Sequence, residues 1–542
     1  MACDLKLVGG EVLDGSGTPA TRADVAIERG VISAIGELSS LESARTIDCA
    51  GKTITPGFID IHSHTDWLLP EADHPALVEP FIRQGMTSLV AGNCGFSPAP
   101  ITDRNRDAVH DSSRLVVDDS IELGWQSMGE FLSALERKGV ALNVAQLVGH
   151  GTVRAAVSGH LDPAVPNPDQ LAQMERFVRE ALDEGCVGVS TGLGYPPGIF
   201  AQHDELVAFA KWAAAADKLF TSHLKAYSKV SGAYQTDPEV EWHNLAAIRE
   251  ILEVAEASRA RLQISHLIFV GRKTWPSHLE AIAKIERARA SGIDVAFDAF
   301  PYTAGNTTAS VLFPPEILPH LETILADANQ RAAIAAFADA AFDQIGFGLA
   351  DIQIMRANVD RWNQYDGLRV TDAAEREGVD PFDFFCRMVI ESQRTARVLI
   401  HTYSGDGDEE QALRAVIAHP LCTVETDTFV TRRGHQNAAS YGTFSRVIST
   451  YVREGLLSLP EAVRKMTGAV ADRLGWKDRG FVRKGAAADL VVLDTGRLDN
   501  QASLDRPAIF PRGIEHVFVN GHHLLAGERY APDGRAGRVL RS

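Results

Sequence analysis

Short apolar runs alternate with helical stretches over most of the chain, and this alternation is its main structural signal. The runs are rich in Val, Ile and Leu, whereas stretches such as Asp169–Glu184 and Asp204–Asp217 have the spacing of helices. Such alternation is typical of βαβ units with parallel strands. The runs expected to be strands are Phe58–Ile61, Ser88–Ala91, Leu142–Val148, Val187–Ser190, Leu219–Ser222, Leu262–Ser265, Val295–Asp298 and Cys422–Glu425.

Eight strand–helix units predict an α/β fold of the (β/α)8 barrel type. One further run, Val398–His401, also has the pattern of a strand and makes a ninth. The stretch from about 304 to 396 is too long for a single crossover, so we expect it to be an inserted helical subdomain.

Both ends of the chain have a different texture. Residues 1–55 and 482–542 contain short β-rich runs separated by glycine-containing turns, such as Asp14-Gly15 and Asn520-Gly521. We expect these ends to combine into one small β-sandwich, so that the chain divides into 1–55, a barrel over 56–481, and 482–542. A length of 542 residues agrees with several units, because single cores stop growing near roughly 250–300 residues.

Charge narrows the possible partners. The chain has 53 Lys and Arg against 71 Asp and Glu, a formal net charge of −18. Nucleic-acid binders usually present a basic face, and anionic lipid also attracts basic segments. The balance therefore argues against nucleic acid and membrane partners and favours a small molecule.

Cysteine use and the N-terminus indicate the compartment. The six cysteines are scattered without CxxC spacing, which fits a reducing environment better than a disulfide framework. No signal peptide is recognisable at the N-terminus, and no apolar run reaches the roughly 18 residues that a membrane span needs. The sequence therefore predicts a cytoplasmic protein.

Metal-ligand residue types recur where the predicted strands end. His62 and His64 follow the first strand and, two apart, can face one ion. In a parallel barrel the carboxyl ends of all strands meet at one rim, where active sites are built. We therefore expect a metal site formed by the residues at five strand ends, namely His62, His64, Cys94, His223, His266 and Asp427.

The donor types identify the metal as zinc. Imidazoles, a thiolate and a carboxylate suit zinc and would be poor partners for magnesium or calcium. Five or six ligand atoms are too many for one tetrahedral ion with an open position. Two neighbouring sites that share the Cys94 thiolate would use them all, so we expect one or two zinc ions.

Several motifs resemble a known family. Thr55–His64 and Lys484–Leu493 look like the opening and closing segments of the amidohydrolase superfamily barrel. Within that superfamily, four further motifs resemble the N-acyl-D-amino-acid deacylase, or D-aminoacylase, family. These motifs are Gly92–Gly95, Ser190–Gly198, Phe300–Ala304 and Gly442–Phe444.

The resemblance implies roles for the ligand residues. Cys94, His223 and His266 would hold the tightly bound zinc, and His62, His64 and Asp427 would form a weaker site with Cys94 as a bridge. Many members bridge their metals with a carboxylated lysine, but residues 186–195 contain none, which favours the cysteine bridge. Asp427 would be the general base that takes a proton from water and passes one to the leaving amine.

Departures from the family pattern lie at substrate-facing positions. D-Aminoacylases typically have a lysine where this chain has Ile268 and an arginine where it has Ala439. Of the groups expected around the substrate's carboxylate, only Tyr302 is clearly kept. Because two charge-assisted hydrogen bonds of roughly 1.5–3 kcal/mol each would be lost, we expect an amide without a free α-carboxylate, neutral or aromatic. Three residues could instead compensate for the lost charges, namely Lys225, Arg432 and Arg433.

The sequence also allows other functional interpretations. The chain could be an N-acyl-D-amino-acid deacylase proper, a lactone, ester, carbamate or cyclic imide hydrolase on the same site, or a non-catalytic binding module. Tyr195 and His150 are further candidates for contact with substrate, whereas His401, also at a strand end, is more simply explained by packing. The sequence does not define the oligomeric state, and an oligomer is possible.

Overall fold

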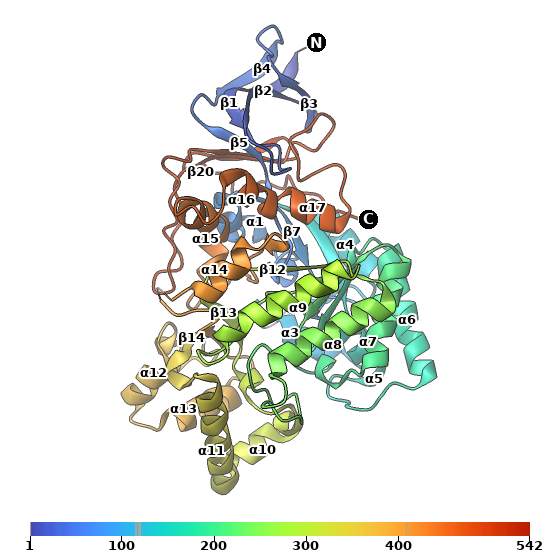
Figure 1. The fold of residues 1–542 in the computed structure, drawn as a ribbon, viewed down its shortest axis with the longest axis vertical. Coiled ribbons are helices and arrows are strands. Elements are labelled where there is room, and N and C mark those ends of the chain that lie inside the picture. Colours follow the sequence, from blue (N-terminus) through green and yellow to red (C-terminus); the bar gives the residue numbers. More distant parts are fainter. Residues whose placement is uncertain (1, 114–115, 118–120, 408) are drawn as a thin grey trace.

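A computed structural model describes residues 2–113, 116–117, 121–407 and 409–542. Figure 1 shows three parts along the long axis of the molecule. Strands from both termini lie at one end, a barrel occupies the middle, and the helices α10–α13 lie at the other end.

The barrel consists of eight parallel strands hydrogen-bonded in the order β16-β12-β11-β10-β9-β8-β7-β6. Its two edge strands meet beyond their carboxyl ends, where Ser63 forms a parallel bridge with Thr428 and the Asp427 amide donates to the His62 carbonyl at 3.0 Å. The predicted eight-stranded barrel is confirmed. Its strands are β6 (Phe58–Asp60), β7 (Met86–Ala91), β8 (Asn143–Gly149), β9 (Gly188–Gly192), β10 (Leu219–His223), β11 (Arg261–Ile264), β12 (Val295–Ala299) and β16 (Cys422–Val424).

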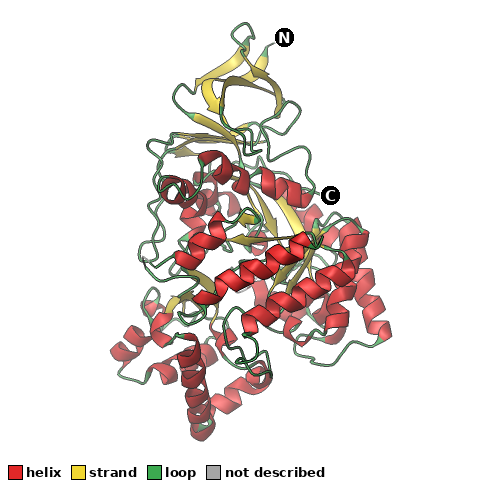
Figure 2. Ribbon diagram, viewed as in Figure 1, coloured by secondary structure: helices red, strands yellow, loops and turns green. Residues whose placement is uncertain are grey.

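Helices cover the outside of the barrel, as Figure 2 shows. Both faces of the strands are therefore buried, which explains their nearly continuous apolar runs. The helix α6 illustrates the local signals: the Asn167 side chain accepts from the Gln170 amide, and Pro168 occupies the first turn. The helices around the barrel include α4 (Met128–Lys138), α5 (His150–Ser158), α6 (Pro168–Asp183), α7 (His203–Ala215), α8 (His243–Ser258), α9 (His278–Ala290), α14 (Gln411–Ala418), α15 (Ala439–Arg446), α16 (Leu459–Met466) and α17 (Gly468–Leu474). Shorter or peripheral helices are α1 (His74–Leu77), α2 (Glu79–Arg83) and α3 (Arg106–Ser113).

The two ends of the chain form one mixed sheet of nine strands. Its halves are joined where β5 pairs antiparallel with β17, and a separate apolar cluster that includes Leu7, Ile27 and Phe518 forms its core. This arrangement confirms the predicted domain built from both termini. The strands are β1 (Cys3–Val12), β2 (Thr21–Glu28), β3 (Val31–Gly36), β4 (Ser43–Asp48), β5 (Thr53–Pro56), β17 (Leu490–Leu493), β18 (Ile514–Val519), β19 (His522–Ala526) and β20 (Arg529–Tyr530).

The long segment after β12 carries a small sheet of its own. The strands β13 (Ala304–Thr308), β15 (Arg397–His401) and β14 (Ile352–Arg356) pair antiparallel in that order. The ninth predicted strand is therefore β15, which lies outside the barrel. We call residues 304–401 the insert. Its helices are α10 (Leu321–Ala326), α11 (Ala328–Ile345), α12 (Val370–Glu377) and α13 (Pro381–Glu391).

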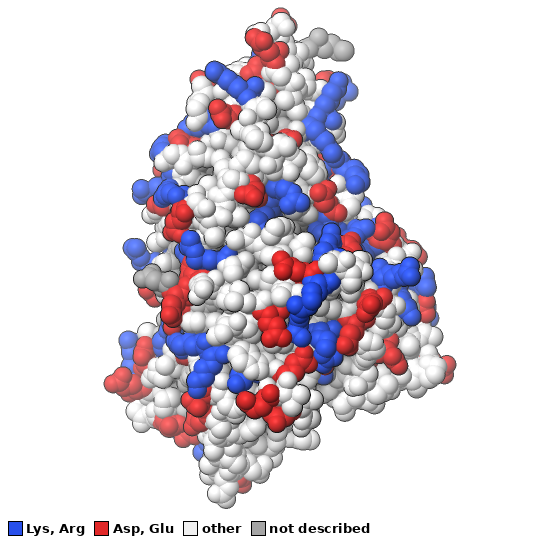
Figure 3. All heavy atoms as spheres, viewed as in Figure 1, with Lys and Arg blue, Asp and Glu red and all other residues white. Residues whose placement is uncertain are grey.

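Surface charge is mixed on the face seen in Figure 3. Basic and acidic side chains interleave over the barrel helices, so the net charge of −18 does not form one large acidic patch on this face. Among the helices of the described residues, none is both long enough and apolar enough to cross a membrane.

Candidate metal centre

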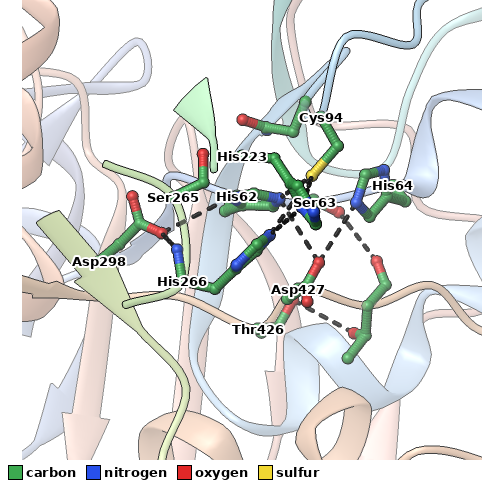
Figure 4. A network of polar contacts seen from close by, with 12 residues as sticks. His62, Ser63, His64, Cys94, His223, Ser265, His266, Asp298, Thr426 and Asp427 are labelled. Atoms are coloured by element: carbon green, nitrogen blue, oxygen red, sulfur yellow. Dashed lines mark hydrogen bonds and ion pairs between the residues drawn. The ribbon is translucent and has the colours of Figure 1, made fainter. Parts of the chain in front are cut away.

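The structure brings all six predicted ligands together at the carboxyl-end rim of the barrel (Figure 4). They form two groups whose ligand atoms lie within 4.8 Å of one another, and Cys94 belongs to both. The first group is Cys94, His223 and His266, and the second is His62, His64, Cys94 and Asp427. The two groups correspond to the two sites that the family resemblance implies, and the role of each residue in them stays a prediction.

Cys94 lies in a tight turn that follows β7. Gly92 and Gly95 adopt φ angles of +80° and +75°, which glycine reaches without steric cost. The turn packs closely on β9, since a Cβ atom at Gly192 would lie 2.0 Å from the Cys94 carbonyl oxygen. The Tyr195 hydroxyl donates to that same oxygen at 2.9 Å. The glycine-flanked motif therefore fixes the thiol at the rim.

Three of the six ligands have left-handed backbone conformations. The φ angles are +54° at Cys94, +31° at His266 and +47° at Asp427. Such conformations are uncommon outside glycine and persist where the surroundings hold them. A hydrogen bond holds each one: from Tyr195 to the Cys94 carbonyl, from the His266 amide to Asp298 at 2.7 Å, and from the Asp427 amide to His62. The strained backbone conformations therefore set the directions of these three side chains.

The environment of Cys94 stabilises its thiolate. Burial alone would raise the pKa of Cys94, but the charge of His62 and hydrogen bonds from His223, His266 and His62 hold it well below its usual range. The Sγ atom lies 3.2 Å from His62 Nε2, 3.6 Å from His223 Nδ1 and 3.5 Å from His266 Nε2. By contrast, burial raises the pKa of Cys422 to about 12. Cys94 is thus suited to binding a metal, and Cys422 is not.

Asp427 is held as a carboxylate by the neighbouring imidazoles. Burial opposes this state, but the charges of His266, His62 and His64 and a hydrogen bond from His64 keep the pKa of Asp427 below its usual value. Its Oδ1 atom lies 3.2 Å from His64 Nε2 and 3.4 Å from His62 Nε2. An ionised carboxylate at neutral pH is what a general base requires.

The donor set fits a pair of divalent ions. Zinc ligands lie about 2.0–2.3 Å from the ion, so neighbouring donors are expected roughly 3–4 Å apart. The separations of 3.5 and 3.6 Å from Cys94 to His266 and His223 agree with this spacing. A thiolate and a carboxylate buried among imidazoles also call for a cation, because buried charges must be balanced. The two groups form a binuclear metal site.

Asp298, at the end of β12, orients the ligands from behind. Its Oδ1 atom accepts from the His266 amide at 2.7 Å and lies 3.6 Å from His62 Nδ1, so Nε2 of His62 is turned toward Cys94. Carboxylates behind ligating histidines commonly set ring orientation and basicity. The sequence prediction did not include Asp298. The available signal was a lone carboxylate in the apolar run Val295–Ala299.

Tyr195 and Tyr227 lie beside the ligand cluster. The Tyr195 ring is 4.9 Å from the His223 ring and 5.1 Å from Phe96. Tyr227, which the sequence prediction missed, lies 4.9 Å from His223 and 5.0 Å from His266. Tyr195 therefore has the position expected of a residue that lines the pocket, and that role stays a prediction.

Three other predicted substrate residues have protein partners of their own. His150 Nε2 lies 2.9 Å from Glu205, which also pairs with buried Arg154. The Tyr302 hydroxyl lies 3.5 Å from Asn500, and the Lys225 ammonium lies 4.9 Å from the centre of the Tyr234 ring. None of these contacts is to a metal ligand, and their substrate roles stay predictions.

The positions that depart from the family pattern are apolar in the structure as well. Ile268 is 6% exposed and Ala439 is fully buried. Of the cations considered as replacements, Arg432 pairs with Glu71 and Asp73 at the surface, and Arg433 is exposed.

A (β/α)8 barrel with a binuclear centre at its carboxyl-end rim is an architecture that metal-dependent hydrolases use. The sequence agrees: residues 45–524 match the profile of the amidohydrolase family, and the chain belongs to that family.

Individual relatives are more specific. N-acyl-D-glutamate deacylase from Alcaligenes xylosoxydans xylosoxydans is 35% identical over 99% of this chain and 96% of its own. The crystal structure of N-acyl-D-glutamate deacylase from Bordetella bronchiseptica, with zinc and a phosphonate inhibitor, superposes with a TM-score of 0.81 at 29% identity. A D-aminoacylase structure solved to study its binuclear metal centre gives 0.80 at 28%. Both structures cover all of each chain.

The protein is therefore an amidohydrolase of the D-aminoacylase kind, acting on carbon–nitrogen bonds other than peptide bonds. The predicted family and enzyme class are confirmed.

Proposed function

We propose that this enzyme removes the acyl group from N-acyl-D-amino acids. The observation that carries the proposal is the shared thiolate: two ligand groups meet at Cys94 with Asp427 in one of them, over a chain that aligns end to end with an N-acyl-D-glutamate deacylase.

The chain's own residues supply the proton transfers. Zinc held by the two ligand groups that share Cys94 would supply polarisation of the amide carbonyl and a lowered pKa of water. Asp427, kept ionised by His266, His64 and His62, accepts a proton from the attacking water and then delivers it to the leaving amine. Asp298 keeps His62 and His266 in orientation, and Tyr195 closes the side of the site next to His223.

A second candidate substrate is an amide without a free α-carboxylate. The apolar side chains of Ile268 and Ala439 favour it, because a buried carboxylate needs charged or hydrogen-bonding partners. This candidate uses the same metal centre and the same base, and it differs only in what the leaving amine carries.

A matched substrate panel tests the proposal. The zinc-loaded enzyme is assayed with N-acetyl-D-glutamate, N-acetyl-D-methionine, N-acetyl-L-methionine, N-acetyl-D-methioninamide and 4-nitroacetanilide. The proposal expects a higher kcat/KM for a D-configured free acid than for its amide and its L-isomer. A preference for methioninamide or the anilide would establish the second candidate, and hydrolysis confined to esters or lactones would exclude both.

A further inference from the structure

A strained turn after β15 carries one tyrosine, Tyr403, that the proposed mechanism does not use. Thr402 and Ser404 have φ angles of +68° and +57°, and the first is an outlier for a β-branched residue. Tyr403 lies between them and is 8% exposed. No sequence motif named above includes this residue.

Hydrogen bonds on both sides hold the turn in this conformation. The Thr402 carbonyl accepts from Trp275 Nε1 at 2.9 Å, and the Tyr403 amide donates to Thr303 at 3.0 Å. Ser404 is tied twice to Phe269: its amide donates to the Phe269 carbonyl at 2.8 Å, and its Oγ accepts from the Phe269 amide at 3.0 Å. Strain that is fixed so completely is characteristic of functional positions.

These contacts join the turn to the segment that follows His266. Tyr403 itself forms an antiparallel bridge with Val270, four residues after that ligand and two after Ile268. Its ring lies against Gly305, where a Cβ atom would be 2.5 Å away, and 6.4 Å from the Phe300 ring. Burial first, and the charge of Asp427 second, raise the pKa of Tyr403.

The Tyr403 hydroxyl has no hydrogen-bond partner among the residues that the structure describes. The other tyrosines named above differ: Tyr195 donates to Cys94, Tyr227 to Ser265, and Tyr302 contacts Asn500. The Tyr403 oxygen is also absent from the fully enclosed unpaired side-chain atoms of the described residues, so it reaches space that a ligand can enter. The turn adjoins the segment that follows His266, in which Ile268 provides only an apolar side chain.

We propose that Tyr403 is a specificity-determining residue. Its hydroxyl donates a hydrogen bond to an oxygen atom of the group attached to the substrate's α-carbon, the carbon that is bonded to the leaving nitrogen. That oxygen belongs to the α-carboxylate of a D-amino acid or to a carboxamide in its place. The inference rests on the proposed function for the identity of the substrate, and on the turn for the identity of the residue.

The test removes the Tyr403 hydroxyl from the protein and the oxygen-bearing group from the substrate, separately and together. Wild type and Tyr403→Phe are compared on N-acetyl-D-methionine, N-acetyl-D-methioninamide and N-acetyl-(methylthio)propylamine, which lacks the oxygen-bearing group. The propylamine is also measured as a competitive inhibitor, so that it is informative even when turnover is slow. Tyr365→Phe is the matched control, because that tyrosine lies in the neighbouring insert and its hydroxyl is paired with Glu377.

We expect Tyr403→Phe to lower kcat/KM for the acid or the amide roughly 10- to 100-fold, mainly through KM, with zinc content unchanged. The propylamine should keep its Ki within about twofold, and Tyr365→Phe should change nothing. An equal loss on all three compounds, or no loss on any, would overturn the role of Tyr403. The relative rates of wild type on acid and amide decide the proposed function separately, and no hydrolysis of any amide would overturn both.

Discussion

His266 and His401 both lie where a strand ends, yet the structure uses them in opposite ways. His266 follows the barrel strand β11 by two residues, and its Nε2 atom lies 3.5 Å from the Cys94 sulfur. His401 ends β15 in the insert, where Nδ1 accepts from Arg369 and Nε2 donates to Gln353, each at 3.1 Å. A strand-end histidine therefore indicates a metal only when its strand closes on the shared rim.

Electrostatics makes the same distinction. Burial and the nearby Arg369 guanidinium lower the pKa of His401 to about 3, so it stays neutral and both ring nitrogens are used in the protein. The imidazoles of the rim instead surround a thiolate and a carboxylate that need positive charge. The first environment is that of a buried packing residue, and the second is suited to a cation.

Replacing each histidine with alanine should give the largest difference between the two sites. His266→Ala removes one of the three donors in its group, so zinc content should fall, and loss of several kcal/mol of stabilisation predicts a decrease of roughly a thousandfold in kcat/KM. His401→Ala should keep its zinc and lose about 1–3 kcal/mol of stability, because partners of a buried group are left unpaired. Metal analysis and denaturant unfolding measure both; equal zinc loss in the two variants would contradict the distinction.

Asp427→Asn should separate catalysis from metal binding within the rim. The amide cannot accept the proton of the attacking water, so kcat should fall roughly 10²- to 10⁴-fold. The group of Cys94, His223 and His266 is intact in this variant and should retain its zinc. An Asp427→Asn enzyme with near-normal kcat would remove Asp427 from the mechanism.

Asp298→Asn tests how much a carboxylate that only orients the predicted ligands contributes, compared with a ligand itself. The substitution keeps the size of the side chain but weakens its hold on His62 and His266. We expect zinc affinity or activity to drop roughly 10- to 100-fold, the usual range for such supporting carboxylates. Gln263 also contacts Asp298, at 2.8 Å, so Gln263→Leu is the control that perturbs the same carboxylate without touching a ligand.

The smallest effect concerns pH. The unfolded chain binds a proton at His401 near pH 6.5, whereas the folded protein does so only near 3. Stability is therefore fully present above pH 6.5 and falls as the pH drops toward 3, by about 2 kcal/mol between pH 7 and pH 5 for this residue. His401→Gln should remove that part of the decrease. Parallel unfolding curves for wild type and variant across this range would show that His401 does not titrate as described.

The barrel and the ligand set were predictable because both follow local rules. Apolar runs alternating with helices define parallel strands, and the strand ends must share one rim, so His62, Cys94 and Asp427 could be brought together without a structure. The terminal sheet was predictable from its turns in the same way.

The turn that carries Tyr403 was not predictable, because it depends on contacts across distant segments. Tyr403 matters only through a turn held by Trp275, Thr303 and Phe269, and no spacing in the sequence encodes that assembly. The run that contains His401 looked like a barrel strand for the same reason: the pattern shows a strand but not the sheet to which it belongs.

Zinc titration of Cys94→Ser tests the central claim most directly, because Cys94 is the donor common to both groups. Metal-free wild type should take up zinc at both groups and gain amide hydrolase activity with it. The serine variant should hold little zinc at equal concentration and hydrolyse no amide detectably. A Cys94→Ser protein that binds as much zinc as wild type and turns over the same substrate would contradict the account.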